Sequence, residues 1–147
     1  MSLIKEIIIY VPIIIIIAAL ASHMVAVPTG SMDPAIQEGD LILTEQTEIL
    51  GVLHELNPED VKVGDIILYK ENSSNGSGLG ESTDIIVHRV IGIEKSGNNT
   101  YFTLKGDNNS APDPEKVTPD QVVGKVIVVD NYVLKIPQIG RIFTPSQ

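Results

Sequence analysis

The sequence contains no cysteine and no tryptophan, and its aromatic side chains are limited to two Phe and four Tyr in 147 residues. The lack of cysteine excludes disulfide bonds, zinc sites built from thiolates and a cysteine nucleophile. The shortage of aromatic rings leaves few platforms on which nucleic-acid bases or sugars could stack. Any nucleophile in this chain must therefore be an oxygen or a nitrogen.

Positive charge is also scarce. Lys and Arg total 10 against 19 Asp and Glu, which gives a formal net charge of -9 at pH 7. A chain with this balance has no basic surface to neutralise the phosphates of a nucleic acid, so no nucleic-acid partner is expected. The length fits one folded domain with a hydrophobic core of its own.

The amino-terminal segment contains a long run without charged residues. It starts at Ile7 and continues to Val27, and it includes Pro12 and five consecutive Ile at 13–17. Twenty-one helical residues cover about 31 Å, close to the thickness of the hydrocarbon core of a bilayer. A solvated helix is disfavoured because Pro12 would break it and the Ile run has no polar face. We predict a transmembrane anchor over residues 1–27.

A cleaved signal peptide is the alternative for this segment, with Ala19-Leu20-Ala21 as its cleavage site. Both interpretations give the same orientation, because Lys5 precedes the apolar run and the next Lys or Arg is Lys62. We therefore expect a single-pass protein of the cell or endoplasmic-reticulum membrane, with a cytoplasmic amino terminus. Residues 28–147 then form an extracytoplasmic domain. N-x-S/T triplets compatible with export begin at Asn72, Asn75, Asn98 and Asn108.

Beyond the anchor, short apolar stretches alternate with turn residues, which predicts an all-β barrel or sandwich. The expected strands are 40–44, 65–69, 84–94, 101–105 and 122–129. Residues 70–84 are rich in Ser and Gly, so we expect a flexible loop there. The tail at 141–147 has no periodic apolar face and is expected to fray.

Two residues of this domain are candidates for nucleophilic chemistry. Ser31 lies in a turn rich in Pro and Gly just beyond the anchor, a setting in which most serines are only caps or solvated hydroxyls. Alternation along the strand at 84–94 places His88 on one face with Ile86 and Val90. Partial desolvation there favours the neutral ring, which can accept a proton. A core histidine satisfied by the backbone is the alternative.

A histidine that acts as a base needs its second ring nitrogen held by a carboxylate or a carbonyl. Asp107 and Asp113 are the candidates, because they flank a polar turn in the segment 105–114. Either one could instead cap that turn. The residues alone leave open which of the two contacts His88.

Five segments, in this order, resemble the sequence boxes of type I signal peptidases. They are S-M-D-P at 31–34, G-D-L-I at 39–42, G-D-I-I at 64–67, H-R-V-I-G at 88–92 and G-D-N-N with D-P at 106–114. Bacterial members of the family carry Lys at the position of His88, whereas endoplasmic-reticulum and archaeal members carry His. The sequence therefore resembles the endoplasmic-reticulum and archaeal subgroup.

The resemblance implies roles for individual residues. Ser31 would be the nucleophile, His88 the general base and Asp113 the acid that orients it, with Asp107 essential or supporting in the same site. Thr29 stands where the family has a hydroxyl two residues before the nucleophile, so we expect it to help stabilise the oxyanion. Met32 is expected to pack near the substrate cleft or the bilayer surface, or else to make ordinary apolar contacts. Arg89 is expected to be structural, paired with an acidic turn.

The resemblance also implies an activity, which is the removal of signal peptides from secreted preproteins through an acyl-enzyme on Ser31. The expected partners are preprotein signal peptides and the lipid bilayer, with accessory subunits possible and no metal or organic cofactor. Many relatives continue after a segment like 136–140 into a second apolar helix, whereas this sequence ends at Gln147. We therefore expect a naturally short or truncated chain.

Two other classes of protein compete with this interpretation. A membrane-tethered β module without enzymatic activity would have the same strands but no use for Ser31, His88 and Asp113 in one place. A self-cleaving repressor-type serine protease would need a Ser-Lys dyad and a DNA-binding domain, and the sequence has an apolar anchor instead.

Overall fold

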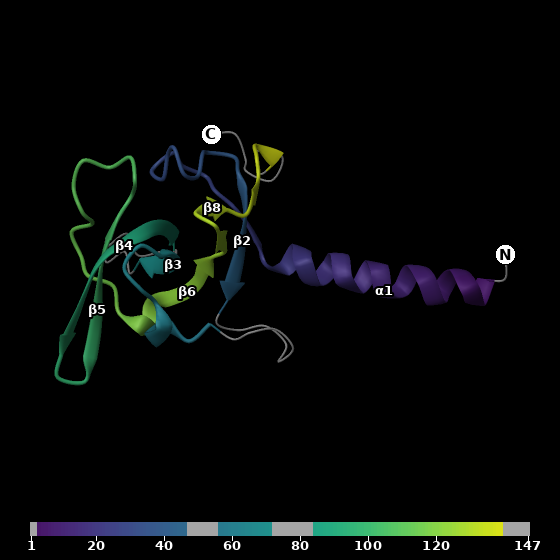
Figure 1. The fold of residues 1–147 in the computed structure, drawn as a ribbon, viewed down its shortest axis with the longest axis horizontal. Coiled ribbons are helices and arrows are strands. Elements are labelled where there is room, and N and C mark those ends of the chain that lie inside the picture. Colours follow the sequence, from purple (N-terminus) through teal and green to yellow (C-terminus); the bar gives the residue numbers. More distant parts are fainter. Residues whose placement is uncertain (1–2, 47–55, 72–83, 140–147) are drawn as a thin grey trace, which may run out of the picture.

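The computed structural model describes residues 3–46, 56–71 and 84–139. The predicted flexible loop at 70–84 and the predicted frayed tail at 141–147 fall mostly or wholly outside these ranges. The described part consists of one helix, α1, followed by a body of β-strands, from which α1 projects alone (Figure 1).

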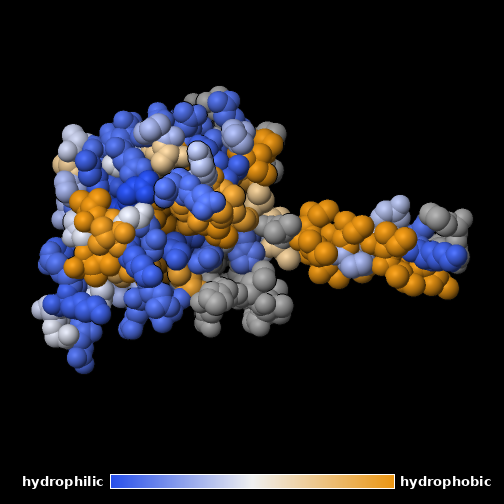
Figure 2. All heavy atoms as spheres, viewed as in Figure 1, coloured by the Kyte–Doolittle hydropathy of each residue, from blue (hydrophilic) through white to orange (hydrophobic). Residues whose placement is uncertain are grey.

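Helix α1 spans Leu3–Ser22, so it starts before the uncharged run and ends before Val27. Its apolar side chains are exposed, and Figure 2 shows them as an almost continuous orange surface. Within the described ranges, no helix combines the length and the hydropathy that a membrane crossing requires. The last part of the predicted anchor is a strand, because Met24–Ala26 (β1) pairs with the next strand of the domain.

The domain is built on an antiparallel sheet, as the all-β prediction requires. The strands after β1 are β2 (Leu41–Gln46), β3 (Ile66–Glu71), β4 (Asp84–Ser96), β5 (Asn99–Lys105), β6 (Val122–Val126), β7 (Val128–Val129), β8 (Tyr132–Val133) and β9 (Lys135–Ile136). The strand order of the main sheet is β1-β2-β6-β3-β4-β5, with β9 also pairing with β2, and a separate small sheet contains β7 and β8. Two short 3-10 turns, Pro58–Asp60 and Pro119–Gln121, lie between strands.

The expected strands are found, with two differences. The segment predicted as one strand at 122–129 is divided into β6 and β7, because Ile127 donates to Leu43 of β2 and accepts from Leu134. Strands β1, β8 and β9 were not predicted. Each has only two or three residues, too few for a period of two to be recognised in the sequence.

Both faces of the central strand β3 are covered by apolar side chains. Ile67 and Tyr69 point into one cluster, which also contains Leu56, Val61, Val90, Phe102, Leu104, Val117 and Val122. Ile66 and Leu68 point into a second cluster with Val27, Met32, Ile36, Ile42, Val87 and Val126. Successive residues of a strand face opposite sides, so four consecutive apolar residues are buried here without alternation. The two clusters hold β3 and β4 rigidly.

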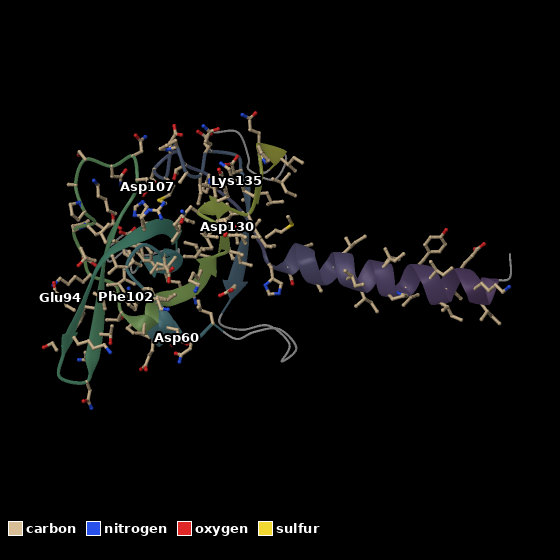
Figure 3. All side chains as sticks on the ribbon, in the orientation of Figure 1. Asp60, Glu94, Phe102, Asp107, Asp130 and Lys135 are labelled. Atoms are coloured by element: carbon tan, nitrogen blue, oxygen red, sulfur yellow. The ribbon has the colours of Figure 1, made fainter. Side chains whose placement is uncertain are left out.

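An ion pair with a buried carboxylate connects β9 to the turn that follows β1. The Asp40 side chain is 1 % exposed, and its Oδ2 accepts from Lys135 Nζ at 2.6 Å and from the Gln37 N–H at 2.9 Å. Lys135, labelled in Figure 3, also donates to the Ala35 carbonyl at 3.1 Å. Burial acts to raise the pKa of Asp40, but the hydrogen bonds from Lys135, Gln37 and Gln138 outweigh it, so the pKa lies below its ordinary value.

We predict that Asp40→Asn lowers the free energy of unfolding at pH 7 by about 3 kcal/mol, because Lys135 loses its buried partner. The folded-state pKa of Asp40 is depressed, so this stabilisation is fully present above the ordinary pKa of 3.8 and is lost as the pH falls through the lower folded-state value. Urea unfolding at several pH values should therefore show the gap between parent and variant closing in acid. Asp60→Asn, at an exposed position, is the control and should change stability by less than about 0.5 kcal/mol. A gap that stays constant with pH would contradict this account.

Candidate active site

Ser31 lies in a turn between β1 and β2 that is held in place by apolar side chains. Met32 and Ile36 are fully buried in the second cluster, and the Ile36 N–H donates to the Met32 carbonyl at 3.0 Å. Ser31 itself is half-buried, whereas the residue that follows it is anchored in the core. Met32 is therefore a core residue with apolar neighbours, and its place near the substrate cleft or the bilayer stays a prediction.

His88 lies on β4 opposite Ile67 of β3 and is 7 % exposed. Its Nε2 is 3.2 Å from Ser31 Oγ, although the two residues are 57 positions apart in the sequence. On the other side of the ring, Nδ1 is 2.6 Å from Asp113 Oδ2. An ionised carboxylate can only accept, so Nδ1 carries the proton and Nε2 is left to accept from the serine hydroxyl. Ser31, His88 and Asp113 thus form a continuous hydrogen-bonded chain.

The path of the chain after β5 decides which carboxylate reaches His88. The Asp113 N–H donates to the Leu104 carbonyl at 2.9 Å, which holds Asp113 beside the end of β5. Asp107 makes a different pair: Arg89 Nε and Nη2 donate to its two oxygens at 2.8 and 2.7 Å. Arg89 also donates to the Gly64 carbonyl at 2.9 Å. Of the two carboxylates that the sequence left open, Asp113 contacts the histidine and Asp107 contacts the expected structural arginine.

The Arg89–Asp107 ion pair is bidentate, a geometry that strengthens contacts between arginine and a carboxylate (Asp107 is labelled in Figure 3). The hydrogen bond with Asp107 raises the pKa of the Arg89 guanidinium, burial opposes this, and the negative charge of Asp107 adds to the rise. Because Arg89 is the residue after His88, this pair joins the strand of the histidine to the loop at 106–109.

That loop in turn holds the backbone of the Ser31 turn. The Asn108 N–H donates to the Ser31 carbonyl at 2.9 Å, and Asn108 Nδ2 donates to the Gly30 carbonyl at 3.2 Å. Gly106 packs so closely that an added Cβ would lie 2.6 Å from the Ser31 carbonyl oxygen. Sequence reasoning missed both supporting residues, although they lie in the G-D-N-N segment that it singled out.

Tyr69 is a further residue that the sequence did not indicate. Its hydroxyl donates to Asp113 Oδ2 at 3.0 Å, and its ring centroid is 6.4 Å from that of His88. Burial raises the pKa of the Tyr69 phenol strongly, and the negative charges of Asp113 and Glu71 raise it further. The phenol is therefore protonated and acts as a donor. Alternation along β3 could have indicated this residue, because it places Tyr69 on the same face as Ile67, which lies opposite His88.

The remaining predicted residue, Thr29, is exposed on the same turn. Its Oγ1 lies 3.4 Å from Ser31 Oγ, so the two hydroxyls are neighbours at the open side of the site. The part of the chain described here contains no group of three or more acidic or histidine side chains arranged to hold a metal ion. The chemistry that the arrangement supports is transfer of the Ser31 proton to His88, with Asp113 stabilising the resulting imidazolium.

Comparisons with known proteins point to one family. The family model for the signal peptidases, peptidase S26, matches residues 1–95, which include Ser31 and His88. The chain is 30% identical to an uncharacterised protein of Methanocaldococcus jannaschii, over 86% of this chain and 84% of that one. It is also 30% identical to the signal peptidase complex catalytic subunit SEC11 of Colletotrichum graminicola, over 82% of this chain and 62% of that protein.

A bacterial relative, signal peptidase I W of Bacillus subtilis, is 31% identical over 66% of this chain and 42% of its own length. The chain thus spans less than two thirds of the length of the named signal peptidases that it matches. No solved structure gives a significant match.

We predict that Gly106→Ala displaces the Ser31 turn, because the new methyl group would overlap the Ser31 carbonyl oxygen and the Asn109 side chain. The variant should lose about 2 kcal/mol or more of unfolding free energy, and the Asn108 amide should exchange faster with solvent. Gly92→Ala is the control, since its Cβ would meet only ordinary contacts, the nearest at 3.6 Å. Parent-like stability and Asn108 protection in Gly106→Ala would show that the close approach is not needed.

Proposed function

Because the chain belongs to the signal peptidase family, peptidase S26, we propose that it is a membrane-attached serine endopeptidase that removes signal peptides from secreted preproteins. The observation that carries the proposal is the hydrogen-bonded chain of Ser31, His88 and Asp113. These three side chains come from separate elements, and a binding module would gain nothing from joining them.

In the proposed mechanism, Ser31 Oγ attacks the carbonyl carbon of the scissile peptide bond while its proton moves to His88 Nε2. Asp113 stabilises the imidazolium through the hydrogen bond to Nδ1. His88 then gives the proton to the leaving amine, and the amino-terminal fragment stays on Ser31 as an ester. A water molecule, deprotonated by the same ring, hydrolyses the ester and restores the serine.

The negative charge that develops on the substrate oxygen needs donors at the open side of Ser31. We assign this role to the Ser31 backbone N–H and to the Thr29 hydroxyl, which is 3.4 Å from Ser31 Oγ. Asp107 acts in the same site without touching His88, because its pairing with Arg89 holds the loop that supports the Ser31 carbonyl. Asp107 is therefore a positioning residue in this proposal.

We predict that Ser31→Ala and His88→Ala each lower the rate of cleavage of a preprotein reporter in detergent by about a thousandfold or more. Ser31→Ala should keep the parent's unfolding curve. His88→Ala removes a buried side chain that holds Asp113, so its cleavage is measured at a temperature at which its own unfolding curve shows a folded chain. Ser96→Ala, an exposed serine at the far end of β4, is the matched control and should cleave at the parent's rate.

Two outcomes would argue against this mechanism. Cleavage that survives Ser31→Ala would remove the proposed nucleophile. A folded parent chain that cleaves nothing, including when membranes and accessory subunits of a signal peptidase complex are supplied, would favour the β module without enzymatic activity. The SEC11 relatives are catalytic subunits of a signal peptidase complex, so accessory subunits are the partners to test first.

Helix α1 is the proposed point of attachment to the membrane. Its Ile side chains are exposed along its length, for example 63% at Ile14 and 61% at Ile15, and it projects away from the domain (Figure 2). Exposed aliphatic surface on this scale favours transfer into lipid. In the arrangement we propose, the amino terminus is cytoplasmic and the catalytic domain extracytoplasmic. Attachment would raise the effective concentration of a substrate held in the same bilayer.

We predict that the parent chain floats with phosphatidylcholine liposomes on a density gradient and that the double variant Ile14→Asp and Ile15→Asp does not. Val63→Asp, which changes a side chain that is 60% exposed in the domain, is the control and should float as the parent does. Because the chain has no cysteine, single Ser2→Cys and Val63→Cys variants can report the two sides in cells. A membrane-impermeant maleimide should label only the Val63→Cys variant, and the reverse pattern would contradict the proposed topology.

A further inference from the structure

The partly buried carboxylate of Asp113 receives two donors on a single oxygen. Oδ2 lies 2.6 Å from His88 Nδ1 and 3.0 Å from the hydroxyl of Tyr69. We propose that Tyr69 is a positioning residue of this site, whose hydroxyl fixes the Asp113 carboxylate against His88 and shares its negative charge. This role rests on the peptidase function proposed above. Tyr69 itself takes no part in the transfer of the proton between Ser31 and His88.

The loop that carries Asp113 has little other means of orienting that side chain. Asp113 stands between Pro112 and Pro114, and neither proline has an N–H to donate. The Asp113 N–H is used on the Leu104 carbonyl, which fixes the backbone but leaves the side-chain torsions free. A donor from a rigid strand can set them. Tyr69 is suitable because it is 5 % exposed in the core of the sheet.

The register between β3 and β4 places Tyr69 close to His88 and Asp113. Ile67 lies opposite His88 and Tyr69 opposite Ile86, so Tyr69 and His88 are diagonal neighbours on one face of β3 and β4. Their rings are tilted by 53° with centroids 6.4 Å apart. Tyr69 and His88 therefore approach Asp113 from two adjacent strands, and both side chains are buried.

The charges around this point are mostly negative, which makes a neutral donor useful. Glu71 follows Tyr69 at the end of β3, and a small hollow beside Asp113 is lined by Tyr69, Glu71, Glu115, Lys116 and neighbouring residues. The nearby cation, Lys116, is engaged with Glu94 at 2.6 Å. The raised pKa of Tyr69 keeps its hydroxyl protonated beside these carboxylates, so the hydroxyl does not become a competing anion. Arg89 is paired with Asp107 on a different loop.

The test is Tyr69→Phe, which keeps the ring in the core and removes only the hydroxyl. We expect kcat/KM for the preprotein reporter to fall about tenfold through kcat, with KM unchanged, because the loss is in orienting the base. The acidic limb of the pH–rate profile should also move to higher pH. Without the tyrosine hydroxyl, more of the negative charge of Asp113 is available to stabilise protonated, inactive His88. Tyr132→Phe, at a position 78% exposed, is the control and should change neither quantity.

Both the kinetics and an NMR measurement can overturn the proposed role of Tyr69. A change in kcat/KM of twofold or less overturns the proposal. A larger fall with an unmoved acidic limb also overturns it, because that pattern indicates a packing role alone. If the parent chain cleaves no reporter, the proposed function has failed and a second measurement tests Tyr69 without activity. The low-field proton NMR signal of His88 Nδ1–H should shift in Tyr69→Phe and not in Tyr132→Phe, and an unshifted signal overturns the proposal.

Discussion

The hydrogen bond between His88 and Asp113 is the contact on which the site depends. It is 2.6 Å long and is assembled from β4 and from the loop that leaves β5. It fixes the tautomer of the ring, and that tautomer directs Nε2 at Ser31 Oγ. The β-sheet supplies what this contact needs: two apolar clusters immobilise β3 and β4, and the Leu104 carbonyl holds Asp113 beside the end of β5.

A second set of contacts holds the nucleophile in register with the base. Arg89, the residue after His88, donates hydrogen bonds to Asp107. In the loop that contains Asp107, Asn108 donates to the carbonyls of Ser31 and Gly30. The Asp40–Lys135 ion pair also connects β9 to the turn after β1. Displacement of the Ser31 turn would break both sets of contacts. Such supports explain how a half-buried serine on a turn can be held within hydrogen-bond distance of a histidine 57 residues away.

Most of the elements could be predicted from the sequence, whereas the contact between His88 and Asp113 was predicted only through the family resemblance and other contacts of the site were not predicted. Alternation around His88 identified its face of the strand, because a period of two is a local property. Alternation could not show whether Asp107 or Asp113 contacts His88, because that depends on which of the two carboxylates pairs with Arg89. Tyr69 and Asn108 were missed because their partners lie 44 and 78 positions away. The predicted anchor at 1–27 includes Met24–Ala26 for a related reason: this segment is apolar like the helix but pairs with β2.

The proposed mechanism requires that Ser31 form a covalent bond with the substrate. The most direct measurement is the intact mass of the chain after acid quenching during turnover of a peptide ester, whose rapid acylation allows the intermediate to accumulate. We expect an adduct equal to the acyl part of the substrate, carried by the proteolytic fragment that contains Ser31 and strongly reduced in His88→Ala. Rapid turnover with the adduct on another residue, or with no adduct at any quench time, would contradict it.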